Sequence, residues 1–228
     1  VGSRPVTMQL MRIAPHLFRG YYCNDSIGKP ISIWGTLDSS LVNIYEETTT
    51  DEDRLFSGYM YDNGKFKGVW HGDGTSYHFE LHTDLKQATL LNVYSLLDSV
   101  KLFPAAANSP MGTMFNSIIW PDSSVDPQVA SFLVNQITGG KAGDPFTYLK
   151  RGIDSFALSY KVAAKDVDTA ELSSGASWNW STESDMKVVY NTWPLLVIEK
   201  YGYDFTGGAH GNWGVQYSSL DLQKRKVL

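Results

Sequence analysis

Cysteine is almost absent from this sequence: Cys23 is the only one among 228 residues. One thiol cannot form a disulfide within the chain, and it cannot build a structural zinc site from cysteine ligands. Both are therefore excluded as the basis of the fold, and a hydrophobic core must hold it. Hydrophobic residues make up 43% of the chain, which is enough for such a core and excludes a disordered chain.

Basic residues and long apolar runs are also scarce. The chain has 19 Lys and Arg against 24 Asp and Glu, a net charge of −5, and no basic run. A nucleic-acid partner would need a basic face to neutralise phosphates, so we expect none. No apolar run approaches the ~20 residues that span a bilayer, so we expect no transmembrane segment. Residues 1–19 lack a signal-peptide stretch, although a removed signal would leave the same sequence.

The usual motifs of catalysis and cofactor binding are missing as well. There is no Gly-x-Ser-x-Gly elbow, no Walker-type phosphate loop and no Gly-x-Gly-x-x-Gly that opens a helix. Ser173-Ser174-Gly175 lies in a loop without that context, and no pair of carboxylates stands out. We therefore predict no catalytic residue and no cofactor, and we favour binding over catalysis.

His78 and His82 have the H-x-x-x-H spacing that can hold a metal when both residues lie on a helix. Here Tyr77, Phe79 and Leu81 alternate with polar residues, which indicates a strand. On a strand the two histidines share a face but lie roughly 13 Å apart, too far for one metal ion. We predict a polar sheet face and no metal at this position.

Residues 17–100 are predicted to be almost entirely β, as an antiparallel meander. Asn63-Gly64 and Asp73-Gly74 are the strongest hairpin signals, because both residues of a tight turn must adopt positive φ. Phe56-Ser57-Gly58-Tyr59 returns ten residues later as Phe66-Lys67-Gly68-Val69, which suggests two paired strands. The predicted strand segments are Ile31–Trp34, Leu41–Tyr45, Arg54–Tyr61, Phe66–His71 and Tyr77–His82.

A different pattern follows residues 103–113, which are rich in small residues and prolines and are predicted to be a linker. An apolar strand over 114–120 comes next. Asp126-Pro127 and Asp144-Pro145 then mark two helix starts, because Asp can cap free N–H groups and Pro suits the first helical position. Apolar residues at helical spacing predict helices over 127–138 and 145–164. Long strands are predicted at 178–190, 195–205 and 213–222.

Together these elements predict an α+β fold with two domains. Residues 1–105 would form a β-rich N-terminal domain built on the antiparallel meander. Residues 106–228 would form a C-terminal subdomain in which two helices pack on one face of an antiparallel sheet.

Two aromatic and glycine-rich segments of the last third are candidate binding elements. Trp178 and Trp180 would share a face of a strand, either as core packing or as an aromatic platform. The segment 206–211, Thr-Gly-Gly-Ala-His-Gly, has three glycines in five positions, which imply positive φ or a close backbone approach. His210 is either a hydrogen-bonded structural residue of a wide turn or, with Trp213, part of a loop that meets a partner.

The segment Tyr201-Gly202-Tyr203-Asp204-Phe205 with the glycine-rich segment after it, followed by Tyr217-Ser218-Ser219-Leu220-Asp221-Leu222, resembles the RsiV-like extracytoplasmic domain. Ile118-Ile119-Trp120-Pro121 and Asn135-Gln136-Ile137 are similar to the strand, proline and first helix of that family. The resemblance covers roughly residues 113–228. The family includes the extracellular part of a lysozyme-sensing anti-sigma factor; the domain also accompanies envelope polysaccharide deacetylases and occurs in envelope lipoproteins.

This resemblance implies an extracytoplasmic location, in the periplasm or at the cell surface, with or without a lipid anchor on a removed N-terminal segment. It implies a module that binds a protein, such as a lysozyme-type hydrolase, or a cell-wall glycan. The family continues past the strand near Leu228, so the C-terminal domain would be truncated. Together with the two segments above, the candidate binding residues are Thr206, Gly207, Gly208, Ala209, His210, Gly211, Trp213, Trp178 and Trp180.

Two other functions stay open at this point. One is a glycan-acting cell-wall enzyme, or a domain associated with a deacetylase, in which His210 and a carboxylate would act as acid and base. The paired-Asp and metal-His motifs of the deacetylase catalytic domain are missing here. The other is a structural envelope protein.

Overall fold

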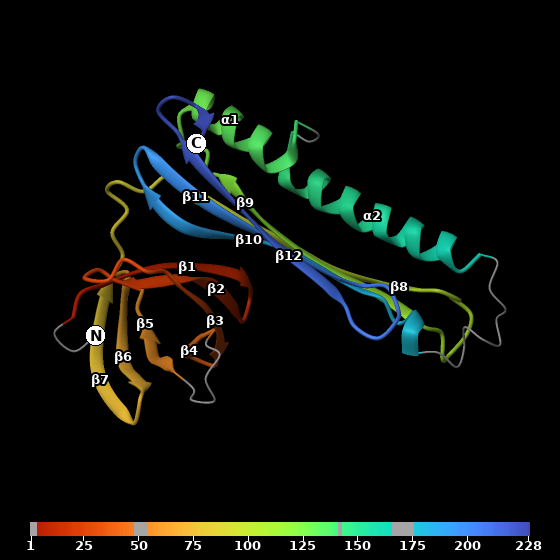
Figure 1. Cartoon of the computed structure of the whole chain (residues 1–228), viewed down its shortest axis with the longest axis horizontal. Helices are drawn as coiled ribbons and strands as arrows, with labels where there is room; N and C mark the ends of the chain where they lie inside the picture. Colours follow the sequence, from red (N-terminus) through yellow and green to blue (C-terminus); the bar gives the residue numbers. More distant parts are fainter. Residues whose placement is uncertain (1–3, 48–53, 141–142, 166–175) are drawn as a thin grey trace. The chain divides into compact units, whose positions relative to one another are not determined.

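A computed structural model describes residues 4–47, 54–140, 143–165 and 176–228 (Figure 1). The polar loop at 48–53 and the Ser173-Ser174-Gly175 loop lie outside the described residues. The chain divides into two compact units, one made of Val1–Leu90, Lys187–Ile198 and Ser218–Leu228, the other of Leu91–Met186 and Glu199–Tyr217. Within the described residues, no helix has the length and apolarity needed to cross a membrane.

The first sheet has seven strands in the order β1 to β7, and each pairs antiparallel with its neighbour in the sequence. This confirms the predicted meander. The echo between residues 56–59 and 66–69 is confirmed as a strand pair, with Gly58 directly opposite Gly68. The strands are β1 (Val6–Ala14), β2 (Leu17–Asn24), β3 (Ile31–Asp38), β4 (Leu41–Glu46), β5 (Leu55–Met60), β6 (Lys65–Gly72) and β7 (Thr75–His82).

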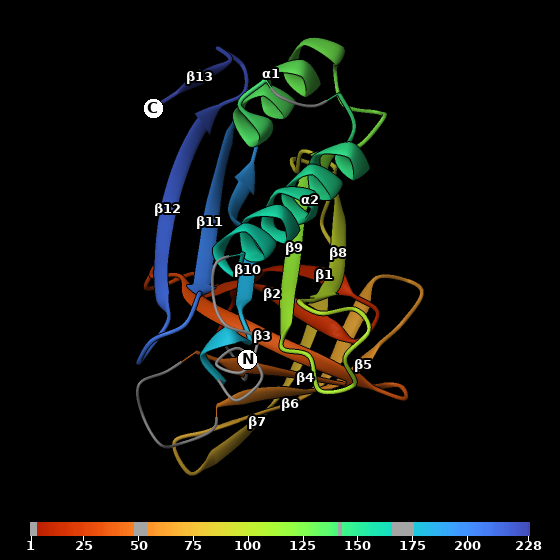
Figure 2. The same ribbon diagram turned by 90° about the vertical axis from the view of Figure 1, so that its right-hand side faces the viewer.

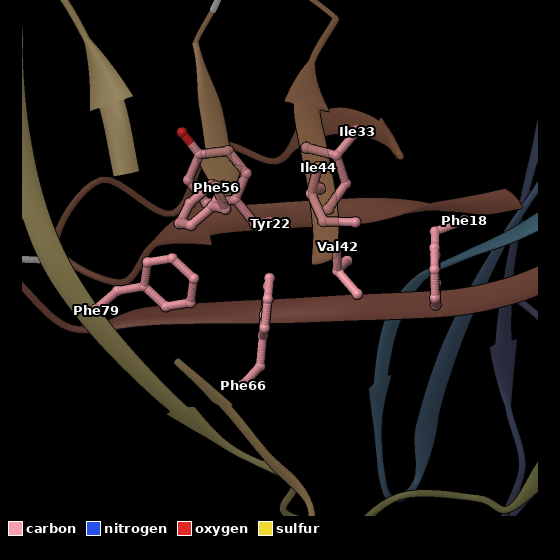
Figure 3. Close-up of a cluster of buried hydrophobic side chains, with 8 residues drawn as sticks. All are labelled: Phe18, Tyr22, Ile33, Val42, Ile44, Phe56, Phe66 and Phe79. Atoms are coloured by element: carbon pink, nitrogen blue, oxygen red, sulfur yellow. The ribbon is translucent and has the colours of Figure 1, made fainter. Parts of the chain in front are cut away.

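The seven strands curl around a core contributed by one face of their own sheet (Figure 3). Period-2 alternation sends every second side chain to this face. Phe56 lies at its centre, fully buried, with edge-to-face contacts to Tyr22 at 5.1 Å and to Phe79 at 5.3 Å between ring centroids. The buried members are Phe18, Tyr22, Ile33, Val42, Ile44, Phe56, Phe66 and Phe79.

Two turns of this sheet carry the predicted Asx-Gly pairs, with different geometry. At the β6–β7 turn Asp73 and Gly74 both have positive φ, 52° and 67°, as a type I′ hairpin requires. At the β5–β6 turn only Gly64 has positive φ, 76°. The longer loop there, closed by the Tyr61 N–H bonding to the Lys65 carbonyl, removes the need for a second positive φ.

Glycines let the first sheet curl tightly enough to enclose its core. A Cβ on Gly68 would lie 1.9 Å from the Ser57 carbonyl oxygen, and one on Gly58 would lie 2.1 Å from the Lys67 carbonyl oxygen. Side chains are therefore excluded where the paired strands β5 and β6 approach each other most closely. Glycine kinks of this kind produce curvature in antiparallel sheets.

We predict that Gly68→Ala destabilises the protein by about 1–3 kcal/mol, because the new methyl group must displace backbone atoms of β5. Urea unfolding followed by tryptophan fluorescence measures the change. Gly202→Ala is the matched control, because a Cβ at Gly202 has no neighbour within 4 Å. Equal stability of the two variants would contradict the close-approach explanation.

The second sheet has six strands in the order β13-β12-β11-β10-β9-β8. β8 pairs antiparallel with β9 along its full length, from Leu91↔Pro121 to Lys101↔Met111. The sequence grouped residues 91–100 with the first domain, which was to end at residue 105, and this pairing corrects that grouping. The strands are β8 (Leu91–Lys101), β9 (Met111–Pro121), β10 (Ser181–Thr192), β11 (Leu195–Phe205), β12 (Asn212–Asp221) and β13 (Lys226–Val227).

Two helices connect β9 to β10, and their boundaries agree with the prediction. α1 spans Pro127–Thr138, and Asp126 caps it by accepting hydrogen bonds from the backbone N–H groups of Gln128 and Val129. Gly139 ends it in the left-handed conformation. α2 spans Pro145–Ala163, and Asp144 caps it through the N–H of Thr147.

Both helices lie on one face of the second sheet (Figure 2). The α+β class is confirmed, but the predicted sheet was antiparallel throughout, and β10 runs parallel to β9. The connection explains the difference: a chain that leaves β9, forms two helices over the sheet and returns beside β9 can enter in the same direction, as in other crossovers.

Candidate binding face

The two faces of the second sheet differ in what covers them. A Cβ on Gly112 of β9 would lie 2.9 Å from the Tyr160 ring of α2. A Cβ on Gly152 of α2 would lie 3.2 Å from Asn116 of β9. The even-numbered residues of β9 therefore face the helices. Strand alternation then places Phe115 on the opposite side, which we call the open face.

The strand register extends the open face across three strands. Phe115 is opposite Leu97 of β8 and opposite Glu183 of β10. Directly paired residues share a face, so these three side chains form a row across the sheet. Leu97 is 66% exposed, whereas Phe115 and Glu183 are half-buried.

On β11 the even residues again face the helices. The Lys200 ammonium donates a hydrogen bond to the carbonyl oxygen of Gln136 in α1, at 3.0 Å. Thr182, paired beside Met114, donates through its hydroxyl to the Asp204 carboxylate at 2.8 Å. Tyr201 and Tyr203 alternate with these residues and so lie on the open face.

β12 completes the open face at the edge of the sheet. The Leu222 N–H donates to the carbonyl oxygen of Pro194 at 2.8 Å, a bond that sets the register of β12 against β11. Counting back along both strands places Trp213 opposite Tyr203 and Val215 opposite Tyr201. Trp213 and Tyr217 are 72% and 59% exposed. We define the open face by Leu97, Phe115, Glu183, Tyr201, Tyr203, Trp213, Val215 and Tyr217.

The 206–211 segment forms the loop between β11 and β12, beside the open face. Gly207 and Gly208 have positive φ, 98° and 95°, which confirms the expectation from the sequence. Gly207 also approaches the backbone, because a Cβ there would lie 2.8 Å from the Ser177 carbonyl oxygen. Gly211 lies against the Tyr203 ring in the same way. Thr206, Gly208 and Ala209 are exposed at the loop surface.

His210 is exposed at this loop. Its Nδ1 lies 3.1 Å from the carbonyl oxygen of Gly211, its one hydrogen-bond partner in the described part of the chain. The account that made His210 a buried structural residue therefore does not match its position. The acid–base pair proposed for a glycan-acting enzyme needs a carboxylate at His210, and within the described residues none is bonded to it.

Trp178 and Trp180 lie elsewhere than on the predicted strand. Trp178 is in a 3₁₀ turn over Ala176–Trp178, and β10 begins only at Ser181. Their rings nevertheless stack, with centroids 6.2 Å apart and planes within 7°. Both pack against the cluster at the end of α2, where the Tyr160 hydroxyl donates to the Trp178 carbonyl oxygen. This position matches the core-packing interpretation better than an aromatic platform.

His78 and His82 lie on a strand, as predicted, and β7 presents both on the outer face of the first sheet. His82 Nε2 lies 2.8 Å from Glu80, which also pairs with Lys67 and Lys65. The hydrogen bond from Lys67, followed by that from Lys65, lowers the pKa of Glu80 to about 2. The described residues contain no group of three metal-ligating side chains.

Most residues of the open face were missed by sequence reasoning. Tyr201 and Tyr203, and then Trp213, Val215 and Tyr217, alternate along two consecutive strands. That alternation was the available signal. It could identify the residues that share a face on each strand, but it could not show that this face is the one that holds Phe115 and Leu97.

We predict that His210→Ala changes the free energy of unfolding by less than about 0.5 kcal/mol, as expected for an exposed side chain. Gly207→Ala should destabilise the domain, because it adds a Cβ at positive φ beside the Ser177 carbonyl. Thermal melts of both variants measure this. If His210→Ala lowered the free energy of unfolding by several kcal/mol, the loop would have a purely structural role.

Comparison with known proteins places part of this chain near one family. Residues 112–213 match the family model described as Deacetylase PdaC. This segment runs from β9 to the start of β12 and contains much of the open face. A search of curated proteins gave no match.

Two solved structures are also similar. A member of the DUF3298 family from Bacteroides fragilis has 19% identity and a TM-score of 0.54, over 63% of this chain and 60% of that one. A DUF3298 family protein from Pseudomonas aeruginosa has 19% identity and a TM-score of 0.33, over 61% of this chain and 55% of that one. The chain thus spans about 60% of the length of the first of these proteins, with which it shares a fold. The resemblance inferred from the sequence is supported as a match to a deacetylase family model and as a fold shared with a DUF3298 family member. Neither comparison names the RsiV-like domain.

Proposed function

We propose that this chain is an extracytoplasmic module of the cell envelope that binds a partner through the open face and the adjoining 206–211 loop. The observation that carries the proposal is the exposure of Trp213, at 72%, on a sheet face that also holds Phe115 and Val215. A monomer gains nothing by leaving the indole ring of Trp213 in water. Contiguous exposed apolar patches are typical of interaction sites, and binding energy concentrates in Trp and Tyr.

The chemistry of the face suits either partner inferred from the sequence. Flat aromatic rings can pack on sugar rings of a cell-wall glycan and on apolar side chains of a protein. Glu183 places a carboxylate within the aromatic surface, next to Phe115. The net charge of −5 favours approach of a basic protein, as a lysozyme-type hydrolase could be. The match to a deacetylase family model supports an envelope location and a role beside a glycan-modifying enzyme.

We predict that Trp213→Ala weakens partner binding by roughly ten-fold or more, as for other aromatic hot spots. Calorimetry with a purified lysozyme-type hydrolase and co-sedimentation with insoluble peptidoglycan measure the two partner classes separately. The matched control is Tyr61→Ala, which removes an aromatic ring that is 51% exposed at the end of β5 in the first sheet. Absence of binding to both partners, or equal weakening by the two substitutions, would contradict the proposed function.

A further inference from the structure

The outer face of β6 and β7, on the far side of the first sheet from its core, gathers basic side chains. Phe66 and Phe79 point into the core, so strand alternation sends their sequence neighbours outward. The outward residues face each other across the two strands as four successive pairs, and each pair contains at least one basic residue. The pairs are Lys65 with His82, Lys67 with Glu80, Val69 with His78, and His71 with Ser76. We call these eight residues the basic band.

The basic groups of the band are accessible to solvent. His71, His78 and His82 are exposed, and the side chains of Lys65 and Lys67 are 35% and 42% exposed. The whole chain has only five histidines, so three of them on one side of two paired strands are a local concentration. Histidine is the side chain that commonly changes its charge between about pH 5 and pH 8. The charge of this surface therefore depends on pH.

The band changes from weakly to strongly basic when its histidines are protonated. With neutral histidines its two lysines face one glutamate, which leaves a single positive charge in a chain whose net charge is −5. Protonation of all three histidines raises the charge of the band to four. A negatively charged partner is therefore held weakly in the first state and strongly in the second.

The neighbouring elements do not offset this change. On β5, the strand beside β6, the residues on the same side are Leu55, Ser57 and Tyr59, and none is a carboxylate. Asp62 and Asp84 lie in the loops at the end of the band that holds Lys65 and His82. At the opposite end Asp73 forms an ion pair with Arg54.

Glu80 shows how the band engages an anion. Its carboxylate accepts from Lys67 Nζ at 2.7 Å and from Lys65 Nζ at 3.3 Å, and it lies 2.8 Å from His82 Nε2. The hydrogen bond from Lys67, followed by that from Lys65, lowers the pKa of Glu80 to about 2, so this carboxylate stays ionised while histidines change their charge. Glu80 thus occupies donors of the band and competes with an anion from outside.

We propose that the basic band binds a linear, phosphate-bearing polymer along β6 and β7 when its histidines are protonated. Side chains on one face of a strand repeat roughly every 7 Å, so the four pairs form a track about 20 Å long. A single small anion would use one or two of these pairs, whereas an extended polyanion meets all four. Each phosphate that the band neutralises also releases counterions, which favours binding.

The side chains of the band favour phosphate over other anionic partners. Lysine and protonated histidine donate N–H groups as compact charges, as in many phosphate sites, and the planar fork of arginine, which matches carboxylates, is absent from these eight described residues. The band also has no Phe, Tyr or Trp on which nucleobases could stack. None of its side chains is an exposed large hydrophobic that could enter a bilayer. This site lies on the first sheet and does not rest on the function proposed for the open face.

Calorimetry with long-chain inorganic polyphosphate, at about pH 6 and about pH 8 in the same low salt, tests the role of the histidines. We expect binding to be roughly ten-fold tighter or more at the lower pH. His78→Asn should weaken binding roughly three-fold at the lower pH and leave it unchanged at the higher pH. His16→Asn is the matched control, because His16 is exposed outside the band. Equal affinity at the two pH values, or equal effects of the two substitutions, would overturn the proposal.

Removal of the competing carboxylate gives a second test, whose expected result is a gain of affinity that unfolding cannot produce. Glu80→Gln should strengthen polyphosphate binding roughly three-fold or more, because the two lysines then meet phosphate instead. Asp154→Asn is the matched control: it also removes one negative charge, from an exposed carboxylate of α2 that pairs with Lys150. Unchanged or weaker binding by Glu80→Gln, or an equal gain in both variants, would contradict the proposed site.

Two comparators test the chemistry of the occupant. Poly-glutamate carries carboxylates on a linear chain, and vesicles that contain phosphatidylglycerol carry phosphates on a bilayer. At the lower pH and at equal concentrations of charge, polyphosphate should bind roughly ten-fold more tightly or more than either. Equal or tighter binding of poly-glutamate or of the vesicles would overturn the assignment of a phosphate polymer.

Discussion

The parallel pairing of β9 with β10 is the constraint on which the functional surface depends. These strands run in the same direction, so the chain between them must cross over the sheet, and it does so as α1 and α2. One crossover covers one face. The apolar residues of β9 on that side, such as Met114 and Ile118, are buried. On the other side Phe115 is half-buried, whereas Ser117 and Ile119, further along the same side, are fully buried. The topology therefore accounts for a side of the sheet without helices, and the open face is the part of that side around Phe115.

The first sheet buries its apolar face without a helix. It curls, and its concave side becomes the core, because the paired glycines Gly58 and Gly68 let β5 and β6 approach closely. Polar groups in this interior must be satisfied. Glu46 has a nearly inaccessible side chain, and its Oε1 accepts hydrogen bonds from the Tyr22 hydroxyl and the Trp70 indole. Its Oε2 has no hydrogen-bond partner among the described residues and is compensated by the Arg54 guanidinium 3.9 Å away. Burial, together with the bond to Glu46, raises the pKa of the Tyr22 hydroxyl far above its usual range, so it remains a donor.

What the sequence could predict was local. Asp126 and Asp144 cap the first turns through bonds that reach only two or three residues, so both helices were located to within a residue. The Asp73-Gly74 turn is equally local. The partner of a strand is not: β8 has the same period-2 pattern whether it pairs with β7 or with β9. For the same reason the direction of β10 was missed, and Trp178 was placed in a strand although the chain turns there.

The candidate site, too, could be predicted only where its signal was local. The 206–211 loop could be found because glycine at positive φ is a property of single residues, and Gly207 and Gly208 have it. The open face could not, because it combines residues from β8, β9, β10, β11 and β12 that are up to 120 positions apart, as Leu97 and Tyr217 are. Trp213 was predicted together with the loop, and the structure also places it on the open face. It begins the strand that follows the loop, so the sheet fixes its backbone while its ring stays in solvent. A recognition residue held in this way loses little conformational freedom on binding, which favours a preorganised surface over a flexible loop as the main contact.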